Sequence, residues 1–326
     1  MSTFLNLGAY PWWVKPPPVA LPYTAAMFDA LTALPEQLQS PDAKRLHIHQ
    51  WLVPNPRGVV QTLHGLGEHQ GVFKSLASVL NGAGWSVVGI DHRGHGQSSG
   101  ERGVIPDPLQ LLHDQARLHD LISAGHRQLP HVMLGASMGG LLAARFAAAA
   151  AQAQGSSPSA PDWWRPLDGL VLIAPALSVQ LPAPQQATLS VLSKLVPDLP
   201  VTLSYLQTWG NSDPEVLHAK QADPLIHTRL TPRVCQFMLH TARAVFEHTA
   251  QWRTPTFMAC SRTDRLVPVN ACERFAAEVP SQVLSTQVYP DMAHDLLHEP
   301  CQADLHVLIV DWLETLIASR NDKAGG

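Results

Sequence analysis

Cysteine is scarce in this sequence: Cys235, Cys260, Cys272 and Cys301 are the four cysteines among 326 residues. They form no C-x-x-C pair, and so few cysteines in a chain of this length exclude a scaffold stapled by disulfides. We therefore expect a reducing compartment, although an even count leaves one bridge open.

Clustered positive charge and long apolar runs are also lacking. The formal net charge is −4 and the lysines and arginines are scattered, so there is no electrostatic reason to expect a nucleic-acid partner. No segment approaches the roughly 18 to 20 uninterrupted apolar residues of a membrane-spanning helix. The N-terminus has neither the basic region nor the apolar core of a signal peptide, so the cytoplasm is the expected location.

What the chain does contain is an alternation of short apolar strands with amphipathic helices. This pattern requires crossover connections and predicts an α/β fold, with a mostly parallel central sheet covered by helices on both faces. Strands are predicted at residues 46–53, 58–63, 85–90, 131–135, 169–173, 256–260 and 285–289. Helices are predicted at residues 73–83 and 109–124, after the strand at 131–135 as far as residue 151, and from 302 onwards.

Two stretches interrupt the alternation. Residues 1–41 are rich in proline and aromatic residues and predict an arm, whose Trp12–Trp13 pair either packs on the domain or touches a membrane or partner. Residues 178–233 contain several prolines, short amphipathic pieces and no clear strand, which predicts a mainly helical cap inserted over the carboxyl edge of the sheet. The core then comprises residues 42–177 and 234–320, and residues 321–326 are a flexible tail.

A serine lies where one strand gives way abruptly to a helix. The sequence GASMG fits G-x-S-x-G, with Ser137 at its centre between Gly135 and Gly139. So tight a turn projects the hydroxyl out of the sheet, and the following helix N-terminus favours a developing negative charge. A side chain in place of either glycine would clash with neighbouring backbone. Because such pentapeptides also occur in ordinary loops, a nucleophilic Ser137 needs a base and an acid.

Candidates for both follow the last two predicted strands. His294 lies in the loop before the final helix, with His298 as its nearest competitor. Asp264 lies in the preceding strand-end loop, where it either orients the imidazole or pairs with a neighbouring arginine. The chain order Ser137, Asp264, His294, with each residue at the end of a separate strand, predicts nucleophilic catalysis by a triad.

A fourth element is the glycine-rich sequence HGLGEH at residues 64–69. It is placed to turn the backbone N–H of Leu66 into the site, opposite the N–H of Met138. Two such donors stabilise a tetrahedral oxyanion, and losing one typically costs about 3 kcal/mol. The two histidines and the glutamate of this loop also suggest a metal cluster, but no further ligand group stands out and no metal is expected.

Five segments occur together and in order: HGLGEH, DHRGHGQSSGERG, GASMGG, TDRLVP and MAHDLLHE. With this set, nearly the whole chain apart from the arm resembles the monoacylglycerol lipase and lysophospholipase-like family of α/β hydrolases. The resemblance implies an α/β-hydrolase fold and makes Ser137 the nucleophile, Asp264 the acid and His294 the base. It likewise implies that Leu66 and Met138 form the oxyanion hole.

The resemblance also makes residues 178–233 a cap over an acyl-binding channel. One departure is Ala136, where the family usually carries histidine, although no catalytic group is removed. Cap residues that are expected either to line the channel or only to pack the cap onto the core are Leu189, Leu192, Leu195 and Val196.

We therefore expect a serine ester hydrolase that cleaves single-chain lipid esters, such as monoacylglycerols, through an acyl-enzyme. It needs no metal or organic cofactor, and its partner is the small lipid or ester substrate, with peripheral membrane contact left open. A lysophospholipase or a general carboxylesterase is the alternative, followed by another chemistry of the same fold, perhydrolysis or C–C hydrolysis. A catalytically silent lipid-binding homologue is the alternative outside enzymes.

Overall fold

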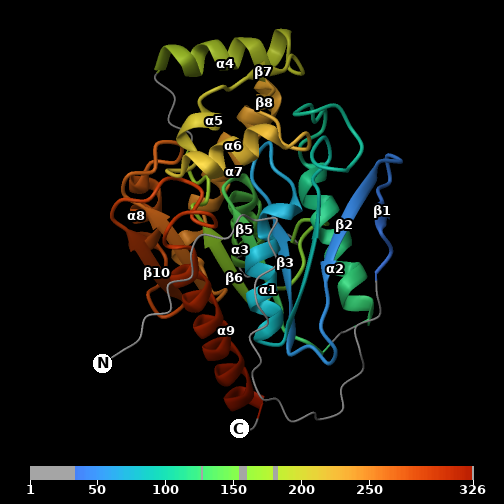
Figure 1. Ribbon diagram of the computed structural model, residues 1–326, viewed down its shortest axis with the longest axis vertical. Helices are drawn as coiled ribbons and strands as arrows, with labels where there is room; N and C mark the ends of the chain where they lie inside the picture. Colours follow the sequence, from blue (N-terminus) through green and yellow to red (C-terminus); the bar gives the residue numbers. More distant parts are fainter. Residues whose placement is uncertain (1–33, 126–127, 154–159, 179–182, 325–326) are drawn as a thin grey trace.

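A computed structural model describes residues 34–125, 128–153, 160–178 and 183–324 (Figure 1). The Trp12–Trp13 pair and most of the predicted arm lie outside these residues. An eight-stranded sheet with the order β1-β2-β4-β3-β5-β6-β9-β10 forms the centre. Its strands are β1 (Gln37–Gln39), β2 (Arg45–Trp51), β3 (Gly58–Leu63), β4 (Trp85–Ile90), β5 (His131–Ala136), β6 (Gly169–Ile173), β9 (Thr256–Ser261) and β10 (Leu284–Tyr289).

Only the β1 end of the sheet is antiparallel. β2 pairs antiparallel with β1 and with β4, whereas every other neighbouring pair is parallel. β3, β4, β5, β6 and β9 are buried along their whole length because both their faces are covered, whereas the edge strand β10 is partly exposed. In β6, Leu170 and Leu172 enter the core on one face, while Val171 and Ile173 enter the core on the other. The mostly parallel sheet predicted from the sequence is confirmed.

Helices cover both faces of the sheet. One face packs against α1 (Lys74–Gly82) and α9 (Gln302–Ala324), and the other against α2 (Gln110–Gly125), α3 (Met138–Ala153), α7 (Pro232–Phe246) and α8 (Val269–Glu278). Two short 3₁₀ helices are η1 (Gln70–Phe73) and η2 (Thr249–Gln251). None of the helices in the described ranges has the length and apolar character that crossing a membrane would require.

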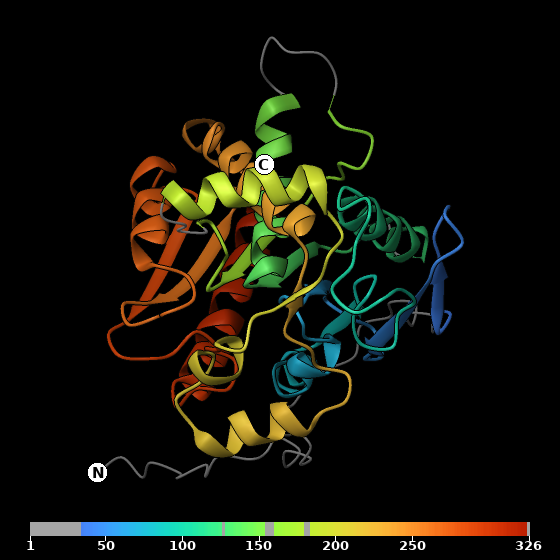
Figure 2. The same cartoon turned by 90° about the horizontal axis from the view of Figure 1, so that it is seen from above.

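The remaining elements form a cap above the carboxyl ends of the strands (Figure 1). They are α4 (Ala183–Leu195), β7 (Val201–Thr202), α5 (Leu206–Trp209), α6 (Pro214–Ala222) and β8 (Arg229–Leu230), with β7 and β8 paired antiparallel. Figure 2, seen from above, shows α4 and α6 as two separate helices on different sides of the cap. Helix α4 lies against α7, whereas α6 lies beside the loop that follows β3.

The structure differs from the sequence-based expectation at several elements. Within the predicted arm, Gln37–Gln39 forms an edge strand, which was not predicted because three residues are too few to show an apolar alternation. Helix α9 continues to Ala324, into the predicted tail. The pattern also missed α7 and α8, although α7 has a recognisable start, with Thr231 as N-cap and Pro232 next. The cap contains the short β7–β8 pair where no strand was expected.

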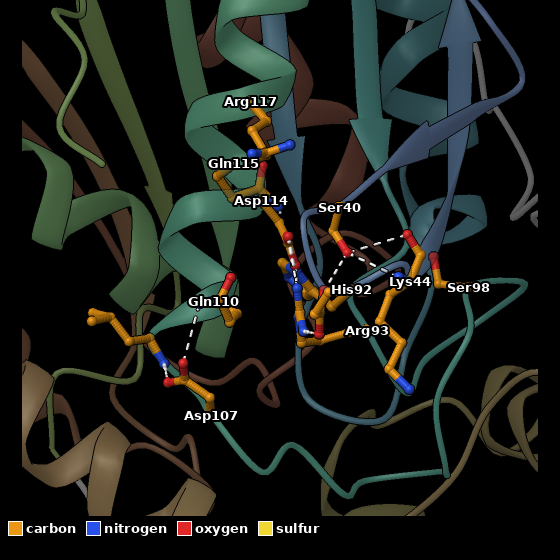
Figure 3. A network of polar contacts seen from close by, with 12 residues as sticks. Ser40, Lys44, His92, Arg93, Ser98, Asp107, Gln110, Asp114, Gln115 and Arg117 are labelled. Atoms are coloured by element: carbon orange, nitrogen blue, oxygen red, sulfur yellow. Dashed lines mark hydrogen bonds and ion pairs between the residues drawn. The ribbon is translucent and has the colours of Figure 1, made fainter. Parts of the chain in front are cut away.

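The glycine- and histidine-rich turn after β4 is fixed by a buried ion pair. Arg93 donates from Nε and Nη2 to the carboxylate of Asp114 on α2, at 2.7 and 2.8 Å, as Figure 3 shows. Its Nη1 also donates to Asp42 at 2.8 Å. Asp114 is 1% exposed, so the bidentate pair satisfies a charge that water does not reach. This turn places His92 and His95 beside the loop after β3.

Candidate active site

Ser137 sits at the sharp turn between β5 and α3. Its φ is +53°, a left-handed conformation that is strained for a residue with a side chain. Three backbone hydrogen bonds, each of 3.0 Å, maintain it: the N–H of Ser137 donates to Ile173 O, and its carbonyl accepts from Leu141 N and Ala176 N. The turn is thus fixed by β6, by α3 and by the segment that follows β6.

The two glycines of the motif are required by close backbone approach. A Cβ on Gly135 would lie 2.3 Å from the carbonyl oxygen of Gly139, and a Cβ on Gly139 would lie 2.0 Å from that of Leu63. Both distances are far below van der Waals contact. The prediction from the sequence, that a side chain at either glycine would clash with neighbouring elements, is therefore confirmed.

His294 and Asp264 are hydrogen-bonded to each other, from separate loops. His294 Nδ1 lies 2.6 Å from Asp264 Oδ2, and the two side chains are 11% and 3% exposed. The other oxygen, Asp264 Oδ1, accepts from the N–H groups of Leu266 and Val267 at 2.8 and 2.9 Å. Burial alone would lower the pKa of His294, but the charge of Asp264 and its hydrogen bond raise that pKa above its ordinary value.

The loops that carry this pair are also tied to each other directly. The hydroxyls of Ser261 and Thr263 donate to the carbonyl of Met292, at 2.6 and 2.9 Å, and the N–H of Met292 donates back to Ser261 Oγ at 3.1 Å. The imidazole and the carboxylate are thus fixed relative to each other by backbone as well as by their own bond. Ser261 ends β9 and Thr263 lies in the loop after it, and neither hydroxyl has a sequence pattern that would distinguish it.

Ser137, His294 and Leu66 line one cavity of about 180 Å³ beneath the cap. The lining is mainly apolar, and the cap supplies much of it. The cap residues are Leu203, Tyr205, Leu206, Leu217, Ile226 and Leu230, and the core residues include Ile173, Met238, Leu266, Val267, Leu296 and Leu297. The structure therefore places the predicted nucleophile and base on one apolar cavity, with the predicted acid hydrogen-bonded to that base.

The oxyanion-hole candidates flank the same serine. Met138 is the first residue of α3, so its N–H has no partner within the helix. Leu66 belongs to the loop after β3, which passes so close that a Cβ on Gly65 would lie 3.3 Å from Ser137 Cβ. Both backbone segments therefore adjoin Ser137.

The other polar side chains of the 64–69 loop bind separate partners. His64 accepts from the N–H of His92 at Nε2 (2.9 Å), so its Nδ1 carries the proton donated to Gly65 O (2.8 Å). His69 Nε2 lies 3.1 Å from Asp223. No group of three potential ligands suited to a metal ion is found among the described residues.

The structure bears on two alternatives that the sequence left open. His298, the competitor of His294, pairs with Asp295 at 2.8 Å rather than with Asp264. The four cap residues singled out on and after α4 do not line the cavity, and Leu195 is 74% exposed, so it neither lines a channel nor packs onto the core. The reason is position: α4 lies against α7, and the later cap segments cover Ser137 instead.

Comparisons with known proteins agree with the motifs. The model of the family described as serine aminopeptidase, S33 (Hydrolase_4) matches residues 54–301. A monoacylglycerol lipase of Mycolicibacterium smegmatis is 30% identical over 266 residues, which are 79% of this chain and 89% of that protein. The monoglyceride lipase of Homo sapiens is 28% identical over 276 residues, or 80% of this chain and 83% of that protein.

A solved structure supports the fold in the same way. The crystal structure of the Paleococcus ferrophilus monoacylglycerol lipase has a TM-score of 0.70 at 24% identity, and covers 84% of this chain and 98% of that chain. The resemblance drawn from the sequence motifs and the predicted α/β-hydrolase fold are both confirmed.

Proposed function

The chain belongs to the serine aminopeptidase S33 (Hydrolase_4) family and is a carboxylic ester hydrolase of the monoacylglycerol lipase type, and we propose that it cleaves single-chain lipid esters through an acyl-enzyme. One observation carries the proposal. Ser137 lies at a strained strand-to-helix turn in the apolar cavity that also contains His294, and His294 is hydrogen-bonded to Asp264.

In the first half of the reaction, Ser137 Oγ attacks the ester carbonyl and His294 Nε2 takes its proton. Asp264 accepts from Nδ1, keeps the imidazole in the required tautomer and stabilises the imidazolium that forms. The tetrahedral oxyanion accepts hydrogen bonds from the N–H groups of Leu66 and Met138. His294 then protonates the leaving alcohol as the carbon–oxygen bond breaks, and the acyl group remains on Ser137.

In the second half, a water molecule replaces the alcohol. His294 removes its proton while the water oxygen attacks the acyl carbonyl, and the same two N–H groups stabilise the second oxyanion. Collapse of this intermediate breaks the bond to Ser137 Oγ, which regains its proton from His294. The products are a fatty acid and the free enzyme, and every step uses groups of this chain and water.

The apolar lining favours esters with an acyl chain. Leu203, Leu206 and Leu217 of the cap, with Met238 of α7, offer a surface on which a hydrocarbon chain leaves water. Monoacylglycerols are the proposed substrates because they combine one such chain with a small neutral alcohol. Lysophospholipids and short carboxyl esters are the alternatives that the same assay separates.

The outer surface of the cap suggests that the protein takes up such substrates from a lipid surface. Apolar side chains that are exposed on and after α4 are Val191, Leu195, Val196, Leu199 and Val201. Exposed apolar side chains gathered on one segment favour contact with a partner or a lipid aggregate. We place the protein in the cytoplasm, in peripheral contact with membranes through this surface; its four cysteines are free thiols, as a reducing compartment favours.

The test is a series of p-nitrophenyl esters of increasing chain length, together with a monoacylglycerol and a lysophospholipid, on the parent protein and on Ser137→Ala. We expect turnover in the parent that increases with chain length, and a loss of about 10⁶-fold in kcat on Ser137→Ala. Ser190→Ala, on the exposed side of α4, is the matched control and should keep full activity.

Two outcomes would contradict the proposal. Unchanged hydrolysis by Ser137→Ala would remove the nucleophile from the scheme. Tight fatty-acid binding by a parent that turns over no ester would instead favour the silent lipid-binding homologue.

A further inference from the structure

Residues 210–227 of the cap, here called the inner cap segment, contact both loops that carry the proposed catalytic groups. We propose that Lys220, on α6, is a positioning residue that holds the oxyanion loop (residues 64–69) and the His294 loop (residues 290–301) at a fixed position relative to each other. This inference rests on the proposed function, because it concerns how the ester-cleaving site is kept in order.

Lys220 joins one carboxylate from each loop. Its Nζ lies 2.6 Å from Glu68 Oε1 in the oxyanion loop and 2.7 Å from Asp295 Oδ2 in the His294 loop. The Lys220 side chain is 17% exposed, and those of Glu68 and Asp295 are 22% and 10% exposed. Charges so shielded from water attract one another more strongly than those of an exposed pair, and the two short contacts hold the three side chains together in one junction.

On the oxyanion side, the junction reaches the backbone next to the proposed donor. Glu68 Oε2 accepts from the N–H of Gly65 at 3.2 Å, while its Oε1 binds Lys220. Gly65 adjoins Leu66 and packs against Ser137. Fixing the Glu68 carboxylate therefore fixes the direction in which the Leu66 N–H points.

On the histidine side, the junction acts on the residue next to the proposed base. Asp295 follows His294 directly, accepts from His298 Nδ1 at 2.8 Å and donates its own N–H to Gly210 O of the inner cap segment at 2.7 Å. With Lys220 on its carboxylate, Asp295 is held through both its side chain and its backbone. The orientation of the His294 ring depends on this anchoring.

Other residues of the inner cap segment hold the oxyanion loop at further points. Asp223 pairs with His69 at 3.1 Å, and the N–H of His227 donates to Gly67 O at 2.8 Å. The contact at Gly67 is so close that a Cβ there would lie 1.9 Å from His227 O. These contacts keep α6 seated on the loop and bring Lys220 to Glu68.

The His294 loop is held in a similar way. Glu299 is 2% exposed and accepts from Ser212 at 2.6 Å (N–H) and 2.8 Å (hydroxyl), and from the N–H of Ala293 at 3.1 Å. The inner cap segment thus contacts both loops at several points, and Lys220 is the side chain at which the two sets of contacts meet.

The charges around His294 give Lys220 an effect that packing alone would not have. The charged groups that face His294 are Asp264, Glu68 and Asp295, and all three raise the pKa of its imidazole. Lys220 lies between the last two and offsets part of their negative charge. Without it, the pKa of His294 should rise further, so the base would stay protonated to higher pH.

The experiment compares Lys220→Met with Lys220→Arg and Glu68→Gln in the full-length protein, using p-nitrophenyl butyrate as the probe. A fluorophosphonate titration counts the competent sites. Lys220→Met should lose about 10- to 100-fold in kcat per titrated site with KM changed less than about threefold, as misplacement of catalytic groups does. The acid limb of its kcat/KM profile should move to higher pH.

The other variants make the test directional. Glu68→Gln removes a negative charge near His294, so its acid limb should move to lower pH than in the parent. Lys220→Arg keeps the positive charge and should recover most of the kcat. Lys194→Met, an exposed lysine of α4, is the matched control and should leave both the rate and the profile unchanged.

The outcomes separate the two proposals. A parent that turns over no ester refutes the proposed function itself. An active parent whose Lys220→Met variant keeps the parental kcat per site and the parental acid limb refutes the role of Lys220 alone. If the circular-dichroism spectrum shows that Lys220→Met is unfolded, Lys220→Gln replaces it, because glutamine is uncharged but still donates a hydrogen bond. Its kcat per site and its acid limb are then compared with those of the parent in the same way.

Discussion

Two parts of the cap differ in the side chains they expose and in what they cover. Helix α4 exposes apolar side chains, with Val191 and Leu195 at 53% and 74% exposure, and its residues are not among those described as lining the cavity. The inner cap segment is more polar, yet Asn211 within it is 4% exposed and Lys220 contacts both the 64–69 loop and the His294 loop. An apolar stripe in an inserted region therefore does not mark the part that belongs to the site.

The physical reason is the kind of surface each part covers. The carboxyl edge of the sheet presents loops with many backbone N–H and C=O groups, and these groups require polar partners when they are covered. The inner cap segment supplies such partners through Ser212, Lys220 and Asp223. Helix α4 lies against α7 instead. The backbone groups of a helix bond to one another, so α4 does not have to supply polar partners for them.

The largest effect that separates the two parts is expected at Gly67. In Gly67→Ala, the new Cβ would meet His227 O at 1.9 Å, in a backbone with φ of +79°. The oxyanion loop and the inner cap segment would be pushed apart, so kcat should fall by about 10²- to 10³-fold, as when one oxyanion donor is lost. Steady-state kinetics on p-nitrophenyl butyrate measures it.

Gly82→Ala is the matched control, because a Cβ at the end of α1 meets nothing within 4 Å. Its kcat should equal that of the parent. A Gly67→Ala variant with parental kcat would mean that the inner cap segment does not control the oxyanion loop.

The second expected effect concerns the contact between core and inner cap at low pH. His227 lies against His95 (ring centroids 4.6 Å apart), and His64 lies against His92 (4.1 Å). Burial lowers the pKa of His92 and of His227 to about 4, mainly by desolvation. In the unfolded chain both histidines have the ordinary pKa of 6.5. Between pH 4 and pH 6.5 the unfolded chain therefore binds more protons than the folded protein.

Stability from these two imidazoles should thus be complete above pH 6.5 and be lost progressively as the pH falls towards 4. We expect the Tm to fall by several degrees from pH 7.5 to pH 5. His227→Gln should reduce this dependence, whereas His240→Gln, on the exposed side of α7, should not. Equal slopes for the parent and His227→Gln would show that protonation at this contact does not limit stability.

The smallest effect on chemistry is expected from α4. Replacing Ala183–Leu195 by a Gly/Ser linker of equal length should leave turnover of p-nitrophenyl acetate within about threefold, because the main described contact of α4 is with α7. Cosedimentation with phosphatidylcholine vesicles containing monoacylglycerol should fall several-fold, since the exposed apolar side chains are lost. A loss of acetate turnover as large as that of Lys220→Met would remove the distinction between the two parts.

Local signals made the core and its candidate groups predictable. Buried parallel strands are continuous apolar runs with turns at their ends, so β3, β4 and β6 are visible in the sequence with their bounds. Ser137 follows β5 directly, and Asp264 and His294 lie three and five residues after the ends of β9 and β10, so each candidate lies near the carboxyl end of its own strand. The polar edge strand β1 was missed because its three residues carry no periodicity.

By itself, the sequence determined the strand-and-helix framework, the glycines of the serine turn and the candidates at the strand ends, because each depends on a few neighbouring residues. Only the tertiary structure decided which half of the cap covers the serine, and that Lys220 meets Glu68 and Asp295. These three residues lie far apart along the chain and share no motif. Their ion pairs exist only because the folded backbone brings the three side chains together where little water reaches them.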